Sequence, residues 1–398
     1  MSNHVQPQLA EVAKLFLKLG TIGFGGPAVH IAMMEDEVVN RRQWLTKEKF
    51  LDLVGATNLI PGPNSTEMAI HIGYIYAGWL GLITAGICFI LPAVLLTGSL
   101  AWVYVNFGSL PAVAPLLYGI KPAVLAIIIS ALWRLAKSAL QPKGATVMKT
   151  RQLLIIAIGC AASVFAGLNE VLAILLGGFL GALWLNLSQN GTNFGWFLGY
   201  PVPLLLAQTG ANSSAAAPPS VWQLGLVFLK VGAVLFGSGY VLVAFLEGEL
   251  VGRGWLTQQQ LLEAIAIGQF TPGPVLSTAT FIGYIIAGWG GAVAATIGIF
   301  LPSFGFVAAL NPLIPKLRAW KWTGAFLDAV NACAVALMVT ATWKLARATF
   351  NLQLSITDID WLAVAIATVA TIAAIRFRLS SLWLVLGGAV VGLCLLAF

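Results

Sequence analysis

Two short stretches contain the residues whose types and spacing could bind a ligand. The first, PGPNSTE, covers residues 61–67, and the second, PGPVLST, covers residues 272–278. Proline removes a backbone donor and clashes with the preceding turn, so each stretch predicts a break in a helix. A helix that begins after such a break presents free N–H groups and the positive end of its dipole, and both favour an anion.

This chemistry predicts an anion site at the two helix starts, where hydroxyl and amide side chains add hydrogen-bond donors. An alternative stays open, in which the breaks only kink helices for packing and the hydroxyls bond back to backbone carbonyls. The duplication of the pattern favours the site. The residues expected to form it are Pro61, Gly62, Pro63, Asn64, Ser65, Thr66, Pro272, Gly273, Pro274, Ser277 and Thr278.

A second repeated pattern is rich in glycine. It reads FGGP at residues 24–27 and FGSG at residues 236–239. Glycine lets a backbone approach a ligand closely, so Gly25, Gly26, Gly237, Ser238 and Gly239 are expected to line the same site. Lys121 lies in an apolar segment and its counterpart is Asn331. Both can donate to an oxyanion, and a lysine inside a membrane is costly enough to suggest a function.

Six charged residues are candidates for coupling or gating. Glu67 or Asp328 could carry a proton or pair with a lysine, and Lys121 with Glu67 is one candidate pair. Lys18 and Lys230 could reach the membrane interface or neutralise a dianion. Glu35 and Glu247 are expected near helix ends, either solvated or in salt bridges that form gates. The candidates are Glu67, Asp328, Lys18, Lys230, Glu35 and Glu247.

Composition indicates which elements must position these residues. The 398-residue chain is 59% hydrophobic and 9% charged, whereas a soluble domain carries about 25% charged residues. Apolar runs such as 80–105 and 285–310 reach the length of about 20 residues that a bilayer core requires. We therefore expect an all-α polytopic membrane protein. The net charge of +7 is attributed to cytoplasmic loops, not to nucleic-acid binding.

The chain also contains an internal repeat. Residues 20–46 align with 232–257, so that Phe24 matches Phe236, and the PGP motifs match at a spacing of 211 residues. This predicts a first copy at 1–187, a linker at 188–220 and a second copy at 221–398. Lysine and arginine concentrate in loops that alternate out of phase between the copies. By the positive-inside rule this predicts inverted-topology repeats of about five spans each, with broken or re-entrant helices at FGGP and PGP.

No enzyme signature is present: the sequence lacks a P-loop, a G-x-S-x-G elbow, an H-E-x-x-H motif and a dinucleotide fingerprint. Three histidines and four scattered cysteines give no metal-ligand spacing. We expect no cofactor and no metal. The expected partners are a small inorganic oxyanion and membrane lipid, with a homodimer as an open possibility.

The stretches FGGPAVHIAMMEDEVV, RRQWL and LIPGPNSTEMAIHIGYIYAGW resemble the chromate ion transporter family, of the long type with two fused homologous domains. The resemblance covers nearly the whole chain. It implies efflux of chromate across the bacterial plasma membrane and chromate resistance, with sulfate, a tetrahedral dianion of similar size, as a competing substrate. The family's motif residues fall on Phe24, Gly25, Gly26, Pro27, His30, Pro61, Gly62, Pro63, Asn64, Glu67, His71 and Gly73.

The second copy departs from this pattern. Pro27 corresponds to Gly239, and Asn64 corresponds to Val275. An asymmetric pair with one specialised half is the simplest interpretation. The sequence therefore predicts a gradient-driven oxyanion transporter in which one half rocks against the other. Sulfate uptake by the same fold and a lipid-phosphate flippase, or a membrane protein without transport activity, remain the alternatives.

Overall fold

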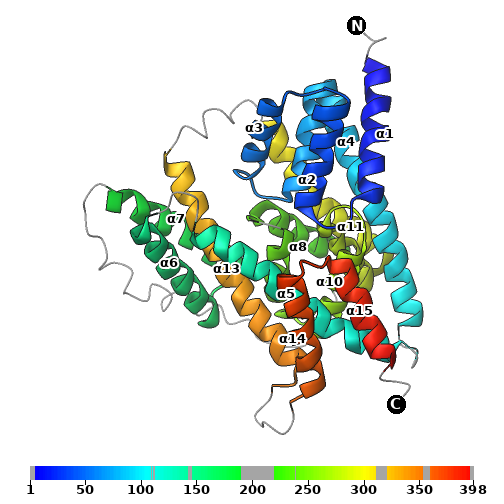
Figure 1. Ribbon diagram of the computed structural model, residues 1–398, viewed down its shortest axis with the longest axis vertical. Helices are drawn as coiled ribbons and strands as arrows, with labels where there is room; N and C mark the ends of the chain where they lie inside the picture. The colour runs from blue at the N-terminus through cyan, green and yellow to red at the C-terminus, as the bar shows by residue number, and fades with distance from the viewer. Residues whose placement is uncertain are drawn as a thin grey trace.

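The computed structural model describes residues 5–108, 110, 113–141, 146–189, 219–237, 239–310, 321–352 and 359–394. Every described element is helical (Figure 1). Within these residues, six helices are long and apolar enough to cross a membrane, and three shorter helices are also apolar. The expectation of an all-α membrane protein is therefore confirmed. Residues 190–218, which make up most of the expected linker, and Ser238 lie outside the described residues.

The elements of the two copies follow one another in the same order. Those of the first copy are α1 (Val5–Ile22), α2 (Pro27–Glu35), the π-helical η1 (Asp36–Arg41), α3 (Lys47–Thr57), α4 (Asn64–Phe107), α5 (Ala114–Leu140), α6 (Val147–Phe165) and α7 (Glu170–Gln189). Those of the second are α8 (Val221–Val234), η4 (Gly239–Val241), α9 (Leu242–Leu246), the π-helical η5 (Glu247–Val251), α10 (Gln258–Phe270), η6 (Val275–Ser277), α11 (Thr278–Leu310), α13 (Lys321–Thr349), α14 (Trp361–Arg376) and α15 (Ser381–Cys394).

The first PGP motif is the tip of a helical hairpin. Helix α3 ends at Thr57 and α4 begins at Asn64, so the motif occupies the turn between them. The ring of Trp44, just before α3, stacks on the ring of Tyr76 with centroids 3.8 Å apart. Because Tyr76 lies 12 residues beyond the start of α4, this contact requires the two arms to run antiparallel and to return to the same end of the molecule.

Helix α4 then reverses direction. Ala77 and Gly78 have non-helical dihedrals, with φ of 62° at Gly78, a conformation that glycine adopts without steric cost. A Cβ on Gly86 would lie 3.0 Å from Ile70, so the segments before and after Gly78 pack side by side. Helix α11 has the same break, with φ of 59° at Gly288. Both copies therefore contain the same compact reversal.

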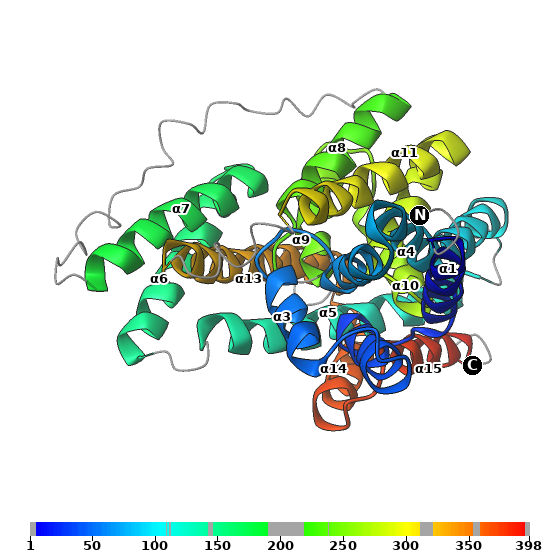
Figure 2. The same ribbon diagram turned by 90° about the horizontal axis from the view of Figure 1, so that it is seen from above.

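The copies are interleaved in space. Helix α5 of the first copy packs on α14 and α15 of the second, and α13 packs on α6 and α7 of the first; Figure 2 shows α6 and α7 beside α13. We call α5–α7 with α13–α15 the flanking bundle. Helices α1–α4 pack with α8–α11 to form the other group, which we call the central bundle. The structure thus divides by bundles rather than by halves, contrary to the expectation that one half rocks against the other.

Candidate functional site

The four non-helical turns of the repeated motifs meet inside the central bundle. The backbone N–H of Gly62, in the first PGP motif, donates to the carbonyl of Leu235 at 2.7 Å. The N–H of Gly273, in the second, donates to the carbonyl of Gly23 at 2.8 Å. Leu235 and Gly23 are equivalent positions at the ends of α8 and α1. Each proline turn is therefore hydrogen-bonded to the glycine-rich turn of the opposite copy.

The first proline turn is closely packed around an acidic side chain. Pro61, Gly62 and Pro63 are buried, and Gly62 has φ of 140°. A Cβ at Gly62 would collide with the carboxylate of Glu67 and would lie 2.6 Å from the hydroxyl of Ser303 in α11. Glu67 is fully buried, and neither of its carboxylate oxygens has a hydrogen-bond partner among the described residues. Pairing of Lys121 with Glu67 was therefore a wrong expectation.

The hydroxyl side chains after the prolines fall into two groups. The hydroxyls of Thr66 and Ser277 are buried and find no hydrogen-bond partner in the described part of the chain. Thr278 instead donates to the carbonyl of Val275 at 2.7 Å, as the packing alternative expects. The amide of Asn64 donates to the Asn58 side chain at 2.7 Å. Thr66 and Ser277 thus have hydroxyls that are able to receive a ligand.

Lys121 and Asn331, which occupy equivalent sequence positions, lie in different surroundings. The ammonium of Lys121 lies 3.5 Å from a carboxylate oxygen of Glu263, and Tyr104 donates to the other oxygen of that carboxylate. The side-chain oxygen of Asn331 lies 3.1 Å from where a Cβ on Gly237 would stand. Asn331 therefore borders the second glycine-rich turn, whereas Lys121 is engaged in an ion pair.

Sequence reasoning missed three polar side chains beside the first glycine-rich turn. The hydroxyl of Tyr240 lies 3.8 Å from where a Cβ on Gly26 would stand and 3.5 Å from the side-chain oxygen of Gln269. Arg134 of α5 lies close enough to Tyr240 for its charge to act on the phenol. Gln269 lies three residues before Pro272 of the second PGP motif, and this proximity in sequence could have indicated it. Nothing local to Arg134 or Tyr240 indicates that the fold brings them together.

Lys18 takes part in an ion-pair cluster with Glu37. Its ammonium contacts the Glu37 carboxylate at 2.6 Å, and Arg42 contacts the same group at 3.2 Å. The guanidinium of Arg42 also covers the ring of Trp44. The hydrogen bond from Lys18, followed by that from Arg42 and the charges of both, outweighs desolvation and lowers the pKa of Glu37 below its ordinary value.

The second copy repeats this cluster in a more buried form. Lys230 contacts Glu249 at 2.5 Å and Arg253 contacts it at 2.6 Å, while Asn169 of α7 donates to it at 3.0 Å. Burial raises the pKa of Glu249. The hydrogen bonds from Lys230 and Asn169 and the neighbouring positive charges lower it by more, so the pKa of Glu249 lies below its ordinary value. Lys18 and Lys230 therefore pair with carboxylates, and neither stands free to neutralise a dianion.

The other predicted coupling and gating residues are also in ion pairs. Glu35 lies 3.8 Å from Lys47, Glu247 lies 2.7 Å from Lys344, and Asp328 lies 2.6 Å from Lys149. Both predicted histidines are buried; His30 contacts the Gly23 carbonyl at 2.8 Å, and both ring nitrogens of His71 lack a partner in the described chain. No cluster of three metal-ligating side chains occurs among the described residues.

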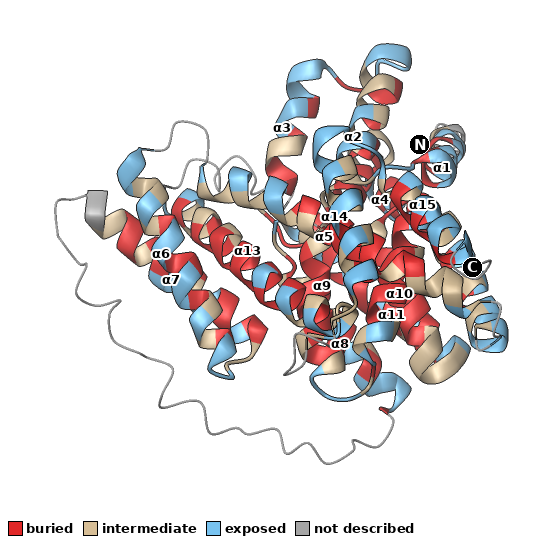
Figure 3. Ribbon diagram, turned by 60° about the horizontal axis from the view of Figure 1, so that its bottom comes forward, coloured by how far each residue is buried: buried red, intermediate tan, exposed pale blue. Residues whose placement is uncertain are grey.

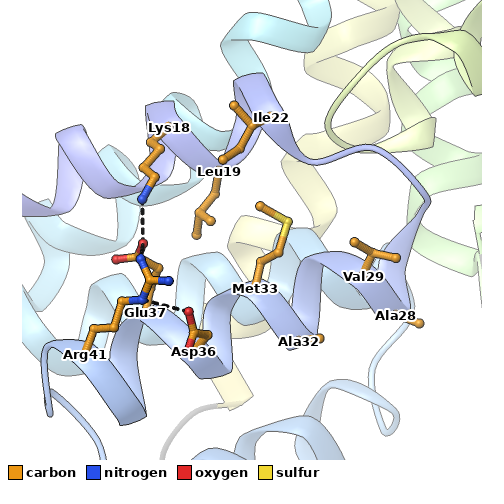
Figure 4. Close-up of a pocket in the computed structure, with 10 residues that line it drawn as sticks. All are labelled: Lys18, Leu19, Ile22, Ala28, Val29, Ala32, Met33, Asp36, Glu37 and Arg41. Carbon is orange, nitrogen blue, oxygen red and sulfur yellow. Dashed lines mark hydrogen bonds and ion pairs between the residues drawn. The ribbon is translucent and has the colours of Figure 1, made fainter.

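A cavity of about 600 Å³ lies between α1 and the α2–η1 segment. Figure 4 shows its lining: Lys18, Leu19, Ile22, Ala28, Val29, Ala32, Met33, Asp36, Glu37 and Arg41. The dashed contacts in that view join Lys18 to Glu37 and Arg41 to Asp36. The cavity therefore borders the first glycine-rich turn and does not lie at the buried proline turns.

Comparison with known proteins finds a duplicated match to one family. A family model described as chromate transporter matches residues 10–182 and again residues 222–393. The chain is 33% identical over 408 residues to a chromate transport protein of Cupriavidus metallidurans, covering 98% of this chain and 95% of that protein. It is also 33% identical over 342 residues to a chromate transport protein of Pseudomonas aeruginosa, covering 84% and 80% respectively.

A probable chromate transport protein of Synechococcus elongatus is 32% identical over 356 residues, which cover 86% of both chains. No solved structure matches the chain. The duplicated family match and the identities over most of the length agree with the repeat that the structure displays. The chain is a helical membrane transport protein, not an enzyme, and it belongs to the chromate transporter family.

Proposed function

We propose that this protein is a secondary transporter that exports chromate across the bacterial plasma membrane by using an ion gradient. Family membership supports chromate as the substrate. The observation that carries the mechanism is the reciprocal meeting of the four turns, through Gly62 with Leu235 and Gly273 with Gly23. Irregular backbone at membrane depth is tolerated only where protein buries it or where it lines a wet cavity.

The oxyanion binds where these turns converge. Helix α4 begins at Asn64 without a side-chain cap, so its first N–H groups and its dipole favour negative charge. The unpartnered hydroxyls of Thr66 and Ser277 supply further donors, one from each copy. Gly25 and Gly26 have φ of 111° and 83°, and the lack of side chains leaves their backbone open to close approach.

The two copies lie in opposite orientations across the membrane. The reciprocal hydrogen bonds relate equivalent residues by an approximate two-fold exchange, as expected of inverted repeats. In Figure 1 the helices α2 and α3 lie above α8 and α10, which agrees with hairpins that enter from opposite faces. The basic loops of the sequence, which alternate out of phase between the copies, also favour opposite orientations.

Glu67 couples transport to protons. Its carboxyl is fully buried in the first turn of α4, without a partner among described residues, and such an intramembrane acid is costly unless it serves a function. An ionised Glu67 occupies the positive end of α4 and repels an arriving dianion, whereas a protonated Glu67 does not. Anion binding at this site would therefore depend on the protonation state of Glu67.

Flux measurements in oriented vesicles test the proposal. Radiolabelled chromate and sulfate are offered to inside-out and right-side-out vesicles, with and without a proton gradient. We expect chromate to accumulate in inside-out vesicles only when the gradient is present, because those vesicles report export. If only sulfate accumulates, sulfate and not chromate is the substrate. If neither anion's accumulation depends on the gradient, secondary transport is refuted.

A further inference from the structure

A cluster of hydrogen-bond donors joins the two bundles beside the first glycine-rich turn. Arg134 belongs to α5 of the flanking bundle, whereas Tyr240 and Gln269 belong to the central bundle. Arg134 is exposed and lies close enough to the half-buried Tyr240 for its charge to act on the phenol. The side-chain nitrogen of Gln269 is buried and has no partner in the described residues, although its oxygen lies within 3.5 Å of Tyr240.

The chemistry of this cluster fits a tetrahedral oxyanion. Guanidinium binds two oxygens of such an anion in a fork and does not lose its charge, and a phenol and an amide each add a donor. Among the described residues, no carboxylate lies within ion-pair distance of Arg134. The opposite wall is the start of α2, where Gly26 precedes Pro27 and adds the positive end of a helix.

We propose that Arg134, Tyr240 and Gln269 recognise the transported oxyanion and set its selectivity, an inference that rests on the proposed function. Gln269 is the strongest indicator. A buried amide donor without a hydrogen-bond partner destabilises the fold unless a ligand or a water molecule accepts its hydrogen bond. The anion is held between the bundles, so any relative movement of the bundles changes its surroundings. Removal of each donor weakens binding of the dianion without altering the packing of the proline turns.

Binding and transport are measured separately for Arg134→Ala, Tyr240→Phe and Gln269→Ala. Binding is read as the rise in unfolding temperature of the detergent-solubilised protein with chromate or sulfate, and transport is read as the KM in vesicles. We expect Arg134→Ala to raise the apparent Kd about tenfold or more, since it removes a charged hydrogen-bond donor. Lys137→Ala, one turn farther along α5 and exposed, is the matched control and should bind as the wild type does.

The outcomes separate this inference from the proposed function. If the wild type binds or transports oxyanions but the three variants match Lys137→Ala, the recognition cluster is refuted while the transport function stands. If no tetrahedral oxyanion shifts the unfolding temperature of the wild type and none is transported in vesicles, both are refuted. If Arg134→Lys retains binding but loses the preference between chromate and sulfate, the planar fork of Arg134 is the source of selectivity.

A different observation carries a second inference: the flanking bundle is docked on one copy only. Helices α5, α13 and α15 pack on α10, and α7 and α13 pack on α9. No comparable packing joins α1–α4 to the flanking bundle within the described residues. Equivalent side chains differ accordingly, since Val241 is 1% exposed and Val29 is 40% exposed. In Figure 3 the buried colour covers α9 and α10 and is sparse on α2 and α3.

The same contrast extends to the hairpin arms. Leu262 of α10 is 2% exposed, whereas its equivalent in α3, Leu51, is 54% exposed. Glu247 pairs with Lys344 across the bundle boundary, whereas Glu35 pairs with the exposed Lys47. The cavity beside α2 is thus the uncovered counterpart of a surface that the flanking bundle covers in the second copy.

We infer that transport proceeds when the central bundle releases its second-copy face from the flanking bundle and docks its first-copy face instead. The two copies share turns, reversals and ion-pair clusters, so each face can serve as the docking surface in turn. By the alignment of the copies, Asp36 is equivalent to Gly248 and Ser380 to Glu170. Because Gly248 contacts Glu170 in this structure, the alternative state brings Asp36 to Ser380.

Cysteine pairs distinguish the two docked states. The variants are built in a chain whose native cysteines are replaced by alanine. The pair Gly248→Cys with Glu170→Cys reports the present state, and Asp36→Cys with Ser380→Cys reports the alternative state. We expect both pairs to crosslink in vesicles, each crosslink to stop chromate flux, and reduction to restore flux. Chromate or a proton gradient should shift the yield from one pair to the other.

The control pair lies within the flanking bundle. Gly177 of α7 faces the native Cys333 of α13, so Gly177→Cys with Cys333 retained should crosslink equally under all conditions. Absence of an Asp36–Ser380 crosslink in every condition, while the Gly248–Glu170 pair crosslinks, refutes the exchange of docking faces. The crosslinking yield requires no flux measurement, so this test does not depend on which substrate the protein transports.

Discussion

Glu67 combines two properties at the scale of a single residue. It occupies the first turn of α4, where the helix dipole favours a negative charge, and it is buried without a hydrogen-bond partner in the described structure. Ser303 and the turn at Gly62 are its immediate neighbours. A group in this position makes anion binding depend on its own protonation.

Replacement of Glu67 by glutamine tests this role. Glu67→Gln imitates the protonated carboxyl, so anion exchange across vesicles at equal pH should remain within about threefold of wild type, while accumulation driven by a proton gradient falls by about tenfold or more. The matched control, Glu48→Gln, alters an exposed carboxyl in the first turn of α3. Retention of gradient-driven accumulation by Glu67→Gln would remove Glu67 from coupling.

The Glu37 ion pair predicts a pH dependence of stability. The pKa of Glu37 is lowered in the folded protein, chiefly by the hydrogen bond from Lys18, and an unperturbed Glu has a pKa of about 4.3. The lowered pKa stabilises the fold fully above that ordinary value, and the contribution is lost as the pH falls through the folded pKa. Thermal unfolding in detergent should therefore show less destabilisation below about pH 4.3 for Glu37→Gln than for the wild type. Equal acid sensitivity of the two would contradict the prediction.

At the scale of elements, the proline turns depend on glycine for both conformation and space. Gly62 has φ of 140°, and its N–H ties the first proline turn to Leu235 of the opposite copy. The turns thus act as connectors between hairpins as well as helix starts. A side chain at this position would clash with Glu67 and Ser303.

Gly62→Ala is expected to destabilise the protein by about 1–3 kcal/mol through overpacking and to abolish transport. Gly159→Ala is the matched control, because a Cβ at that helical position contacts nothing within 4 Å and alanine favours a helix by up to about 1 kcal/mol. The measurements are unfolding temperature in detergent and chromate flux in vesicles. Normal flux in Gly62→Ala would show that the turn is not part of the transport site.

At the scale of the whole molecule, the orientation of the copies decides the mechanism. Lys47 and Gln258 occupy equivalent positions at the starts of α3 and α10. If the repeats are inverted, Lys47→Cys and Gln258→Cys react with a membrane-impermeant maleimide from opposite sides of the membrane. Labelling of both from one side would instead place the two-fold axis along the membrane normal. Protein content and flux of the two single variants serve as controls for folding.

The sequence by itself determined the class of protein and its duplicated plan. Continuous apolar runs as long as a bilayer indicate membrane-spanning helices, because a helix of that length satisfies all of its backbone hydrogen bonds within itself in lipid. Proline and glycine are local signals, so the helix ends beside Gly25 and Pro61 could be placed from spacing alone. Family resemblance followed from the same motifs, and the family is confirmed.

Only the tertiary structure decided which side chains meet. The partners of Lys121, Lys18 and Glu67 depend on contacts between segments far apart in the chain, and periodicity carries no information about such contacts. Arg134 lies near Tyr240 because α5 crosses to the opposite copy, and the bundles interleave for the same reason. Local sequence specifies where a helix breaks, whereas the packing of many apolar faces at once specifies what the break touches.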